Sequence, residues 1–197
     1  MDLEEKVKIP LFPLSIFPLP GELVPLHIFE PRYRQLLEDA EARDISFGIY
    51  FKHPINEGNF GSMVKLESVI KRFPGGESDI IVRCTDLFVL GRLFRTYRDK
   101  LYPGGEVGFL NIDLTESVTE RLHREFVLYR SMLNINQHAP ELSVFHIANE
   151  LNLDFEERVK FVVMTQQQKE HFLLSRIQFQ KHILLEAEKS RDIFHLN

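Results

Sequence analysis

The stretch from Ile9 to Leu37, IPLFPLSIFPLPGELVPLHIFEPRYRQLL, decides the architecture that we expect for the first half of the chain. Two apolar runs, residues 9–14 and 23–28, contain prolines, which cannot donate a backbone hydrogen bond to a sheet and therefore belong at sheet edges or bulges. The Pro20-Gly21 dipeptide between them favours a turn. Apolar residues then recur at helical spacing after Pro31, a residue that suits the first position of a helix. We therefore expect a proline-bearing hairpin that leads directly into an amphipathic helix.

Composition indicates a soluble globular protein. The 197 residues are 44% hydrophobic and 27% charged, with a net charge of −5, and this acidic balance counts against a nucleic-acid partner. Four basic residues lie close together in sequence and are interpreted as solvated charges: Arg92, Arg95, Arg98 and Lys100. Cys84 is the only cysteine. We interpret it as a small core residue, and the lack of any internal disulfide fits a reducing compartment.

Membrane insertion and secretion are not expected. The N-terminal residues are charged and polar, unlike a signal peptide. No apolar run approaches the roughly 20 residues that a membrane-spanning helix needs. We therefore expect a cytoplasmic protein.

The chain continues with strands and then with helices. Strand-like patterns are predicted at residues 46–51, 60–73, 79–84, 87–97 and 106–112, with a bulge near Glu67-Ser68 in the second. After Asp113 the helical signals take over. Ser117 and Glu120 have the spacing of a capping box. The apolar stripes expected to face inward are Leu122, Phe126, Tyr129 and Leu133; Val159, Val162 and Val163; and Leu173, Ile177, Leu184 and Leu185.

This order predicts an α+β fold with two parts. A β-rich part, residues 1–113, precedes a helical part, residues 114–197. No Gly/Ser-rich linker separates the two, so we expect them to pack against each other.

Sequence motifs for catalysis are missing. The chain contains no phosphate-binding glycine frame, no G-x-S-x-G and no paired Cys/His set for zinc. His27 and Glu30 could form an acid–base pair, but nothing supplies a nucleophile or a metal beside them. We expect no catalytic residue, no metal and no cofactor.

Four segments carry a resemblance to a known family: Pro10-Leu11-Phe12-Pro13-Leu14, Phe17-Pro18, Pro20-Gly21 and Leu26-His27-Ile28-Phe29-Glu30-Pro31-Arg32-Tyr33. In order and spacing they resemble the N-terminal substrate-binding domain of the ATP-dependent protease Lon (protease La), here standing alone. The resemblance implies a twisted, mostly antiparallel, PUA-like pseudo-barrel with one inserted helix, followed by a helical bundle. It assigns structural roles to Pro13, Pro20, Gly21, His27, Phe29, Glu30, Pro31, Arg32 and Tyr33. At the corner between the second strand and the helix, Phe29 and Tyr33 are expected to anchor the helix to the sheet, and Glu30 can pair with Arg34.

The resemblance further implies a non-catalytic module that binds unfolded or tagged polypeptides or a partner protein, and that acts as an adaptor in proteolysis. The first candidate surface is the loop with Ile16, Phe17 and Leu19, unless Phe17 folds back onto the sheet as a core residue. The second is Phe172 and Phe179 on the last helix, unless they pack on a neighbouring helix. A ligand- or RNA-binding pseudo-barrel and an enzyme of unknown class remain alternatives, and the sequence leaves self-association open.

Overall fold

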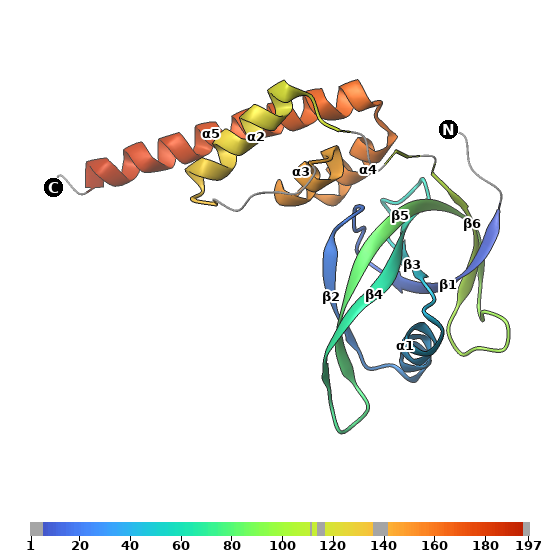
Figure 1. Ribbon diagram of the computed structural model, residues 1–197. Helices are drawn as coiled ribbons and strands as arrows, with labels where there is room; N and C mark the ends of the chain where they lie inside the picture. The colour runs from blue at the N-terminus through green and yellow to red at the C-terminus, as the bar shows by residue number, and fades with distance from the viewer. Residues whose placement is uncertain (1–5, 111, 114–116, 136–141, 195–197) are drawn as a thin grey trace. The chain divides into compact units, whose positions relative to one another are not determined.

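The computed structural model describes residues 6–110, 112–113, 117–135 and 142–194, with the side chains of the last helix described as far as residue 187. The chain divides into two compact units, Met1–Asp113 and Leu114–Asn197. Figure 1 shows a strand-rich unit and a helical unit, and each is described by itself.

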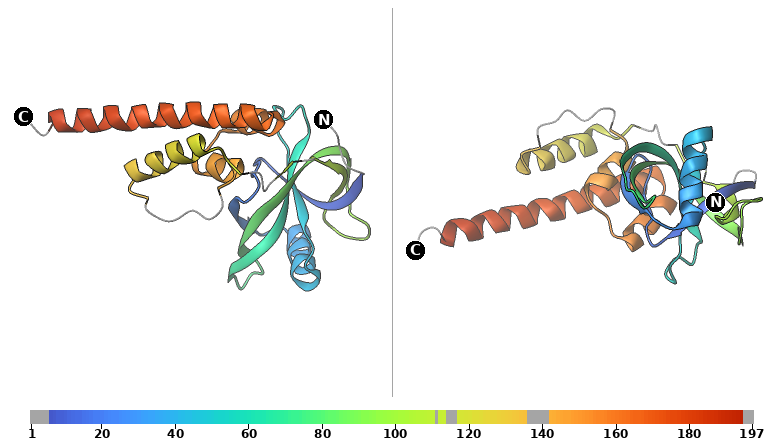
Figure 2. Two further views of the ribbon diagram at one scale, coloured as in Figure 1. Left: turned by 45° about the horizontal axis from the view of Figure 1, so that its top comes forward. Right: turned by 90° about the horizontal axis from the view of Figure 1, so that it is seen from below.

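The strand-rich unit is a small closed barrel with one helix. Its elements, in chain order, are β1 (Val7–Leu14), β2 (Leu23–Ile28), α1 (Pro31–Arg43), β3 (Phe47–Phe51), β4 (Phe60–Arg72), β5 (Ser78–Phe94) and β6 (Gly104–Phe109). The strand order is β2-β5-β4-β3-β1-β6, and β5 also pairs with β6. That last pairing closes β5, β4, β3, β1 and β6 into a ring, while β2 adds to the first half of β5. All neighbours are antiparallel except β1 and β3. The curling of the strands is visible in Figure 1 and Figure 2.

The predicted hairpin of the two proline-bearing strands does not form. β1 pairs with β3 and β6, whereas β2 pairs with β5. The reason lies in the connecting loop, which is part of the core and not a tight turn. The carbonyl of Pro18 accepts a hydrogen bond from Ser62 Oγ at 2.6 Å and a weaker one from Cys84 Sγ at 3.4 Å. These contacts hold the loop against β4 and β5, so the two runs that it joins reach different partners.

β5 is a single 17-residue strand, where the sequence predicted two strands separated by Thr85-Asp86. The prediction was wrong because Asp86 remains in the ladder opposite Met63. At this point the strand changes partners, from β2 along its first half to β6 along its second. The predicted bulge in β4 is confirmed by the register shift between Leu66 and Ser68. Long, bulged strands of this kind let a small sheet bend far enough to close.

Glycines allow the strands to approach the barrel core closely. Ile9, Leu11, Phe88, Leu90 and Val107 form one buried cluster there. A Cβ placed on Gly61 of β4 would lie 2.3 Å from Cζ of Phe88, and one on Gly48 of β3 would lie 2.6 Å from a methyl carbon of Leu11. The phenyl ring of Phe88 therefore occupies the space that side chains at these two positions would need.

Helix α1 begins at Pro31, as predicted, and Tyr33 anchors it. The Tyr33 side chain is 4% exposed, and its ring centroid lies 4.0 Å from that of Phe12 on β1. The expectation that Phe29 also anchors the helix was wrong, since its side chain is 57% exposed. Phe29 directly follows the buried residue Ile28, and its side chain lies outside the core against the ring of His27.

The ion pairs at the strand-to-helix corner also differ from the prediction. Glu30 pairs with Arg32, two residues away, at 2.7 Å. Arg34 instead reaches the turn between β4 and β5, where it contacts the Glu77 carboxylate at 3.2 Å and donates a hydrogen bond to the Gly75 carbonyl at 2.7 Å. Arg34 therefore ties α1 to the sheet and does not pair within the helix.

The helical unit contains α2 (Glu120–Met132), α3 (Val144–Glu150), α4 (Phe155–Val163) and α5 (Gln166–Phe194). α2 lies along α5, joined by a hydrogen bond from Tyr129 Oη to Gln180 Oε1 at 2.7 Å and an ion pair between Lys181 and Glu125 at 3.1 Å. The core is aromatic and aliphatic, with fully buried side chains at Phe126, Phe145, Phe161, Leu173 and Ile177. The residues that the structure describes thus form a mixed α+β fold with a six-stranded, mostly antiparallel sheet and five helices.

Several predicted details of the helical unit were wrong. Thr119, not Ser117, caps α2, because its Oγ1 accepts a hydrogen bond from the N–H of Leu122. Three residues expected to face inward are instead exposed: Leu133, Val163 and Leu185. Leu133 follows the last residue of α2, Val163 is the last residue of α4, and Leu185 lies on α5 beyond the fully buried Ile177, so helical spacing alone did not decide their burial. Among the described residues, no helix is long and apolar enough to cross a membrane.

Candidate functional site

The residues considered for catalysis are not assembled into a reactive group. His27 Nδ1 lies 2.6 Å from the Asp79 carboxylate, on the exposed surface of the sheet, while Glu30 pairs with Arg32. His27 and Glu30, which the sequence analysis considered as an acid–base pair and set aside, therefore have different partners. Burial raises the pKa of the Cys84 thiol far above its ordinary value, which disfavours the nucleophilic thiolate. In the part of the chain that the structure describes, no three His, Cys, Asp or Glu side chains gather where they could hold a metal ion.

The loop at residues 15–19 does not present the apolar surface that the sequence analysis considered. Phe17 is 3% exposed and Leu19 is fully buried, and only Ile16 is partly accessible. The ring of Phe17 lies 6.1 Å from that of Phe60 on β4. The alternative interpretation, in which Phe17 folds back onto the sheet, describes the structure.

The two phenylalanines of α5 are more accessible. Phe172 is half-buried, with its ring 6.0 Å from that of Phe161, whereas Phe179 is 56% exposed. Seven residues separate them, which is close to two helical turns, so they lie on the same side of α5.

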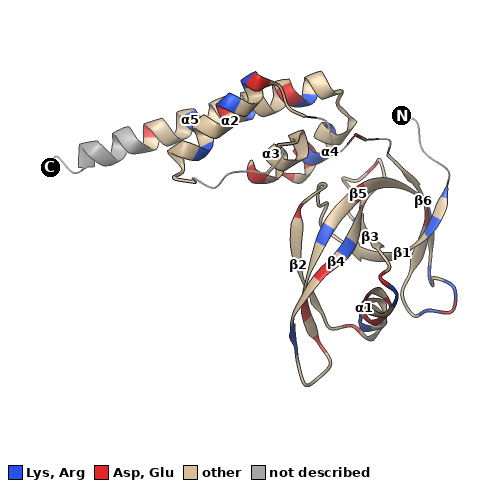
Figure 3. Ribbon diagram, in the orientation of Figure 1, with Lys and Arg blue, Asp and Glu red and all other residues tan. Residues whose placement is uncertain are grey.

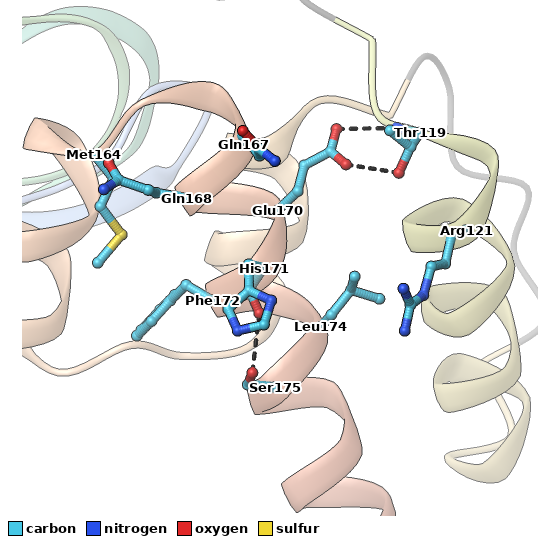
Figure 4. A pocket seen from close by; sticks show the side chains of 10 residues that line it. All are labelled: Thr119, Arg121, Met164, Gln167, Gln168, Glu170, His171, Phe172, Leu174 and Ser175. Atoms are coloured by element: carbon cyan, nitrogen blue, oxygen red, sulfur yellow. Dashed lines mark hydrogen bonds between the residues drawn. The ribbon is translucent and has the colours of Figure 1, made fainter.

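Phe172 lines an open pocket of about 760 Å³ on the helical unit. The first turns of α5 form its floor, and the start of α2 contributes Thr119 and Arg121 (Figure 4). The apolar lining comes from Met164, Phe172 and Leu174. In Figure 4 the side chain of Phe172 points to the side where Met164 lies, and that of Leu174 points towards Arg121. The pocket is therefore a broad, shallow and mostly apolar surface with polar groups around it.

A hydrogen-bonded pair fixes the wall of this pocket. The Glu170 carboxylate accepts hydrogen bonds from the N–H of Thr119 at 3.1 Å and from its Oγ1 at 2.6 Å (Figure 4). Thr119 is also the N-cap of α2. The start of α2 is thus tied to the first turns of α5, so the pocket is formed before any ligand arrives.

The chemistry that this surface offers is non-covalent. Met164, Phe172 and Leu174 can pack against apolar side chains, and the thioether of Met164 adapts to different shapes. Gln167, Gln168 and His171 carry donors and acceptors that can serve a peptide backbone. Such a combination of an apolar floor and a polar rim is typical of sites that bind peptides and small organic ligands.

Sequence reasoning found part of this pocket and missed the rest. Phe172 was identified, but Met164, Leu174 and the contact of Thr119 with Glu170 were not. Neighbouring residues of a helix point about 100° apart, and here Leu173 is fully buried while Leu174 is only half-buried, so the sequence alone did not separate the two leucines. The contact between α2 and α5 joins residues 51 positions apart, a separation for which helical periodicity gives no signal.

The chain is similar to known proteins over most of its length. The sequence model of the family described as the ATP-dependent protease La (LON) substrate-binding domain matches residues 8–170. Among solved structures, a Lon N-terminal domain protein from Xanthomonas campestris is 24% identical, with a TM-score of 0.66 and coverage of 86% of this chain and 98% of that one. The N-terminal domain of a Lon protease from Mycobacterium avium complex is 14% identical, with a TM-score of 0.59 and coverage of 87% and 98%. Comparison with curated protein sequences gives no match.

Proposed function

Because the chain belongs to the family of ATP-dependent protease La (LON) substrate-binding domains, we propose that it binds unfolded or tagged polypeptides without catalysing a reaction on them. The observation that carries the proposal is the open apolar pocket of about 760 Å³ on the helical unit. The pocket is larger than one side chain needs and has polar groups at its rim. An extended segment with one or two apolar side chains matches this surface.

The energy of binding would come from apolar burial. Transfer of a Leu or Phe side chain from water to an apolar surface contributes about 1.5–3 kcal/mol. Hydrogen bonds from Gln167, Gln168 and His171 to the peptide backbone would add orientation without selecting a sequence. Ordering of a flexible chain offsets part of this gain, so one segment would bind weakly. Weak, sequence-tolerant binding suits a protein that captures many different unfolded chains.

Phe179 extends the same apolar surface along α5. It lies seven residues beyond Phe172 and is 56% exposed, so a longer bound segment would cover it as well. We propose that Phe172 and Phe179 contact the same bound chain. In proteolysis, a module of this kind would act as an adaptor that holds a substrate while another protein cleaves it.

The test is the binding of a permanently unfolded protein, such as fluorescently labelled, reduced and carboxymethylated α-lactalbumin, measured by anisotropy. Leu174→Asp places a charge in the pocket and is expected to weaken binding at least tenfold, about 1.4 kcal/mol. Leu185→Asp is the matched control, because Leu185 is an exposed leucine of the same helix outside the pocket.

Two results would contradict the proposal. One is equal binding by the Leu174→Asp and Leu185→Asp variants, which would mean that polypeptides bind outside the pocket. The other is binding that disappears steeply as salt rises, which would indicate an electrostatic partner such as RNA instead of an apolar one. Circular dichroism melts of both variants establish that the fold is intact.

A further inference from the structure

A second pocket, of about 320 Å³, lies in the barrel unit. It is lined by the start of β1, the end of α1 and the loop between β5 and β6. This loop contains most of the basic segment at residues 92–100, and Figure 3 shows it to be rich in Lys and Arg. The sequence analysis interpreted those charges as solvated. The structure places two of them, Arg98 and Lys100, in the lining of this pocket.

The lining has an excess of positive charge. It includes four cationic side chains, Lys8, Arg43, Arg98 and Lys100. The carboxylate beside them is that of Asp39, which lies 2.7 Å from Lys100 Nζ and 3.7 Å from Arg43. Asp44, next to Arg43, pairs with Lys65 outside the pocket at 2.7 Å. Asp39 thus balances Lys100 and Arg43, whereas no ion pair holds Lys8 or Arg98 among the described residues, and an anionic ligand would supply the missing negative charge.

The partners of Asp39 fix the lining in place. Asp39 is 7% exposed and accepts hydrogen bonds from Lys100 Nζ at 2.9 Å and from Tyr102 Oη at 2.7 Å. Lys100 and Tyr102 are thus held in a single arrangement. Lys8 and Arg98 are exposed and instead lie over aromatic rings, at 5.7 Å from Phe94 and 5.2 Å from Tyr97.

The backbone at Arg98 is an independent observation. Arg98 has a φ of 53°, in the left-handed region, where a residue with a Cβ is strained and glycine is not. Strained residues of this kind concentrate at ligand sites, where the position of the side chain matters more than the cost to the fold. Here the strained residue is an arginine that lines the cationic pocket.

Aromatic rings complete the pocket. The rings of Tyr97 and Tyr102 are nearly parallel, with centroids 6.1 Å apart and an angle of 20° between their planes. Both tyrosines line the pocket. Tyr97 also reaches β1, where its Oη donates a hydrogen bond to the Lys8 carbonyl at 3.4 Å.

We propose that this pocket binds a small ligand that carries a phosphate monoester or pyrophosphate group. Arg98, Lys8 and Arg43 would contact the phosphate oxygens, and Tyr97 would pack against the organic part of the ligand. A phosphate monoester carries about two negative charges near neutral pH and a pyrophosphate group carries more, which matches the excess of cations better than the single charge of a carboxylate does. The planar guanidinium groups of Arg43 and Arg98 can each donate two hydrogen bonds to phosphate oxygens.

The experiment uses pyrophosphate as the probe, with the full chain, in isothermal titration calorimetry at low salt. We expect saturable binding with one site per chain. Arg98→Gly removes the cation and the backbone strain together, so it is expected to weaken pyrophosphate binding at least tenfold while the melting temperature stays the same or rises. Lys8→Gln is also expected to weaken pyrophosphate binding.

Arg124→Gly is the matched control, because Arg124 is an exposed arginine of the helical unit, far from this pocket in sequence. The Arg124→Gly variant should bind pyrophosphate with the same affinity as the unmodified chain. Titrations with citrate, a polycarboxylate, and with a single-stranded RNA test whether the pocket prefers phosphate groups to carboxylates or to a nucleic acid. Binding of citrate as tight as that of pyrophosphate, binding of RNA alone, or an unchanged pyrophosphate affinity in Arg98→Gly would each overturn the proposal.

Discussion

Asp39 shows how a single side chain joins distant parts of the barrel unit. It lies on α1 and is 7% exposed, and it accepts hydrogen bonds from Lys100 and Tyr102 at the far end of the β5–β6 loop. Burial alone would raise the pKa of the Asp39 carboxyl, but these two hydrogen bonds, with the nearby charges of Lys100 and Arg43, hold the pKa below its ordinary value. The ionised form therefore prevails in the folded protein, and it stabilises the fold.

We predict that Asp39→Asn lowers the free energy of unfolding by about 1–3 kcal/mol at neutral pH, because Lys100 then loses its charged partner in a largely buried position. The sign of the pH dependence follows from the lowered pKa. The stabilisation is fully present above the ordinary pKa of an aspartate and is lost as the pH falls through the lowered, folded-state pKa. The difference between the unmodified chain and the variant should therefore shrink in acid, as measured by urea unfolding at a series of pH values.

Asp44→Asn is the control for this prediction. The Asp44 side chain is 79% exposed and pairs with Lys65 on the surface. Surface ion pairs contribute about 0–1 kcal/mol, so this variant should be nearly neutral. An equal loss of stability in both variants would mean that overall charge, and not the contact with Lys100 and Tyr102, causes the effect.

At the scale of strands, the barrel depends on glycine where a strand crosses the core. A Cβ on Gly61 would lie 2.3 Å from Phe88 Cζ and 2.9 Å from the Ile49 carbonyl oxygen. The Phe88 side chain is fully buried, so the ring has little room to move away. The tight approach of β4 to this ring therefore requires a residue without a side chain.

We predict that Gly61→Ala lowers the free energy of unfolding by about 1–3 kcal/mol, the usual cost of an added methyl group in a packed core. Gly91→Ala on β5 is the matched control, because the nearest atom to its added Cβ is the Glu106 carbonyl oxygen at an acceptable 3.4 Å. Guanidinium unfolding of the two variants gives the comparison. Equal stability of Gly61→Ala and the unmodified chain would show that Phe88 can shift without cost.

Most elements could be predicted from sequence, whereas their pairing could not. Apolar periodicity and Pro31 located α1, and the bulge near Glu67-Ser68 followed from a break in alternation. The hairpin of β1 and β2 was wrong because a run of apolar residues does not reveal its partner, and residues 15–22 contribute buried side chains to the core. Strand pairing over long sequence separations is a property of the folded barrel.

In the candidate sites, too, local features could be predicted from sequence and long-range contacts could not. Phe172 could be identified from its place opposite the core side of α5, since helical spacing is a local property. For Phe17 the sequence left exposure and burial both open, because burial in a loop depends on what folds over it, and the structure buries Phe17 and Leu19. The pocket of the barrel unit brings together Lys8, Arg43 and Arg98 from three separate segments, so the charged segment at residues 92–100 could not show by itself that a pocket exists.

At the scale of the whole molecule, each of the two units has its own core. The barrel closes on itself and buries residues from β1, β5 and β6 in one cluster. The helical unit buries a separate set of side chains, which includes Phe126, Phe145 and Phe161. A closed sheet has few unpaired edges; in the described barrel unit they include the outer side of β2 and the second half of β4, which pairs with β5 alone. These features are those of a unit that can fold independently.

We therefore predict that a fragment of residues 1–113 folds without the helical unit. Its length exceeds the roughly 60 residues at which small domains become stable alone, and it contains every strand of the ring, including the pair formed by the N–H of Leu110 and the Leu87 carbonyl. Urea unfolding should give one cooperative transition, and amide proton spectra should be well dispersed. Shortening the fragment to residues 1–100 removes β6 and opens the ring, so this control should be unfolded. If the fragment of residues 1–113 instead binds a hydrophobic dye and unfolds without cooperativity, the barrel depends on the helices for its stability.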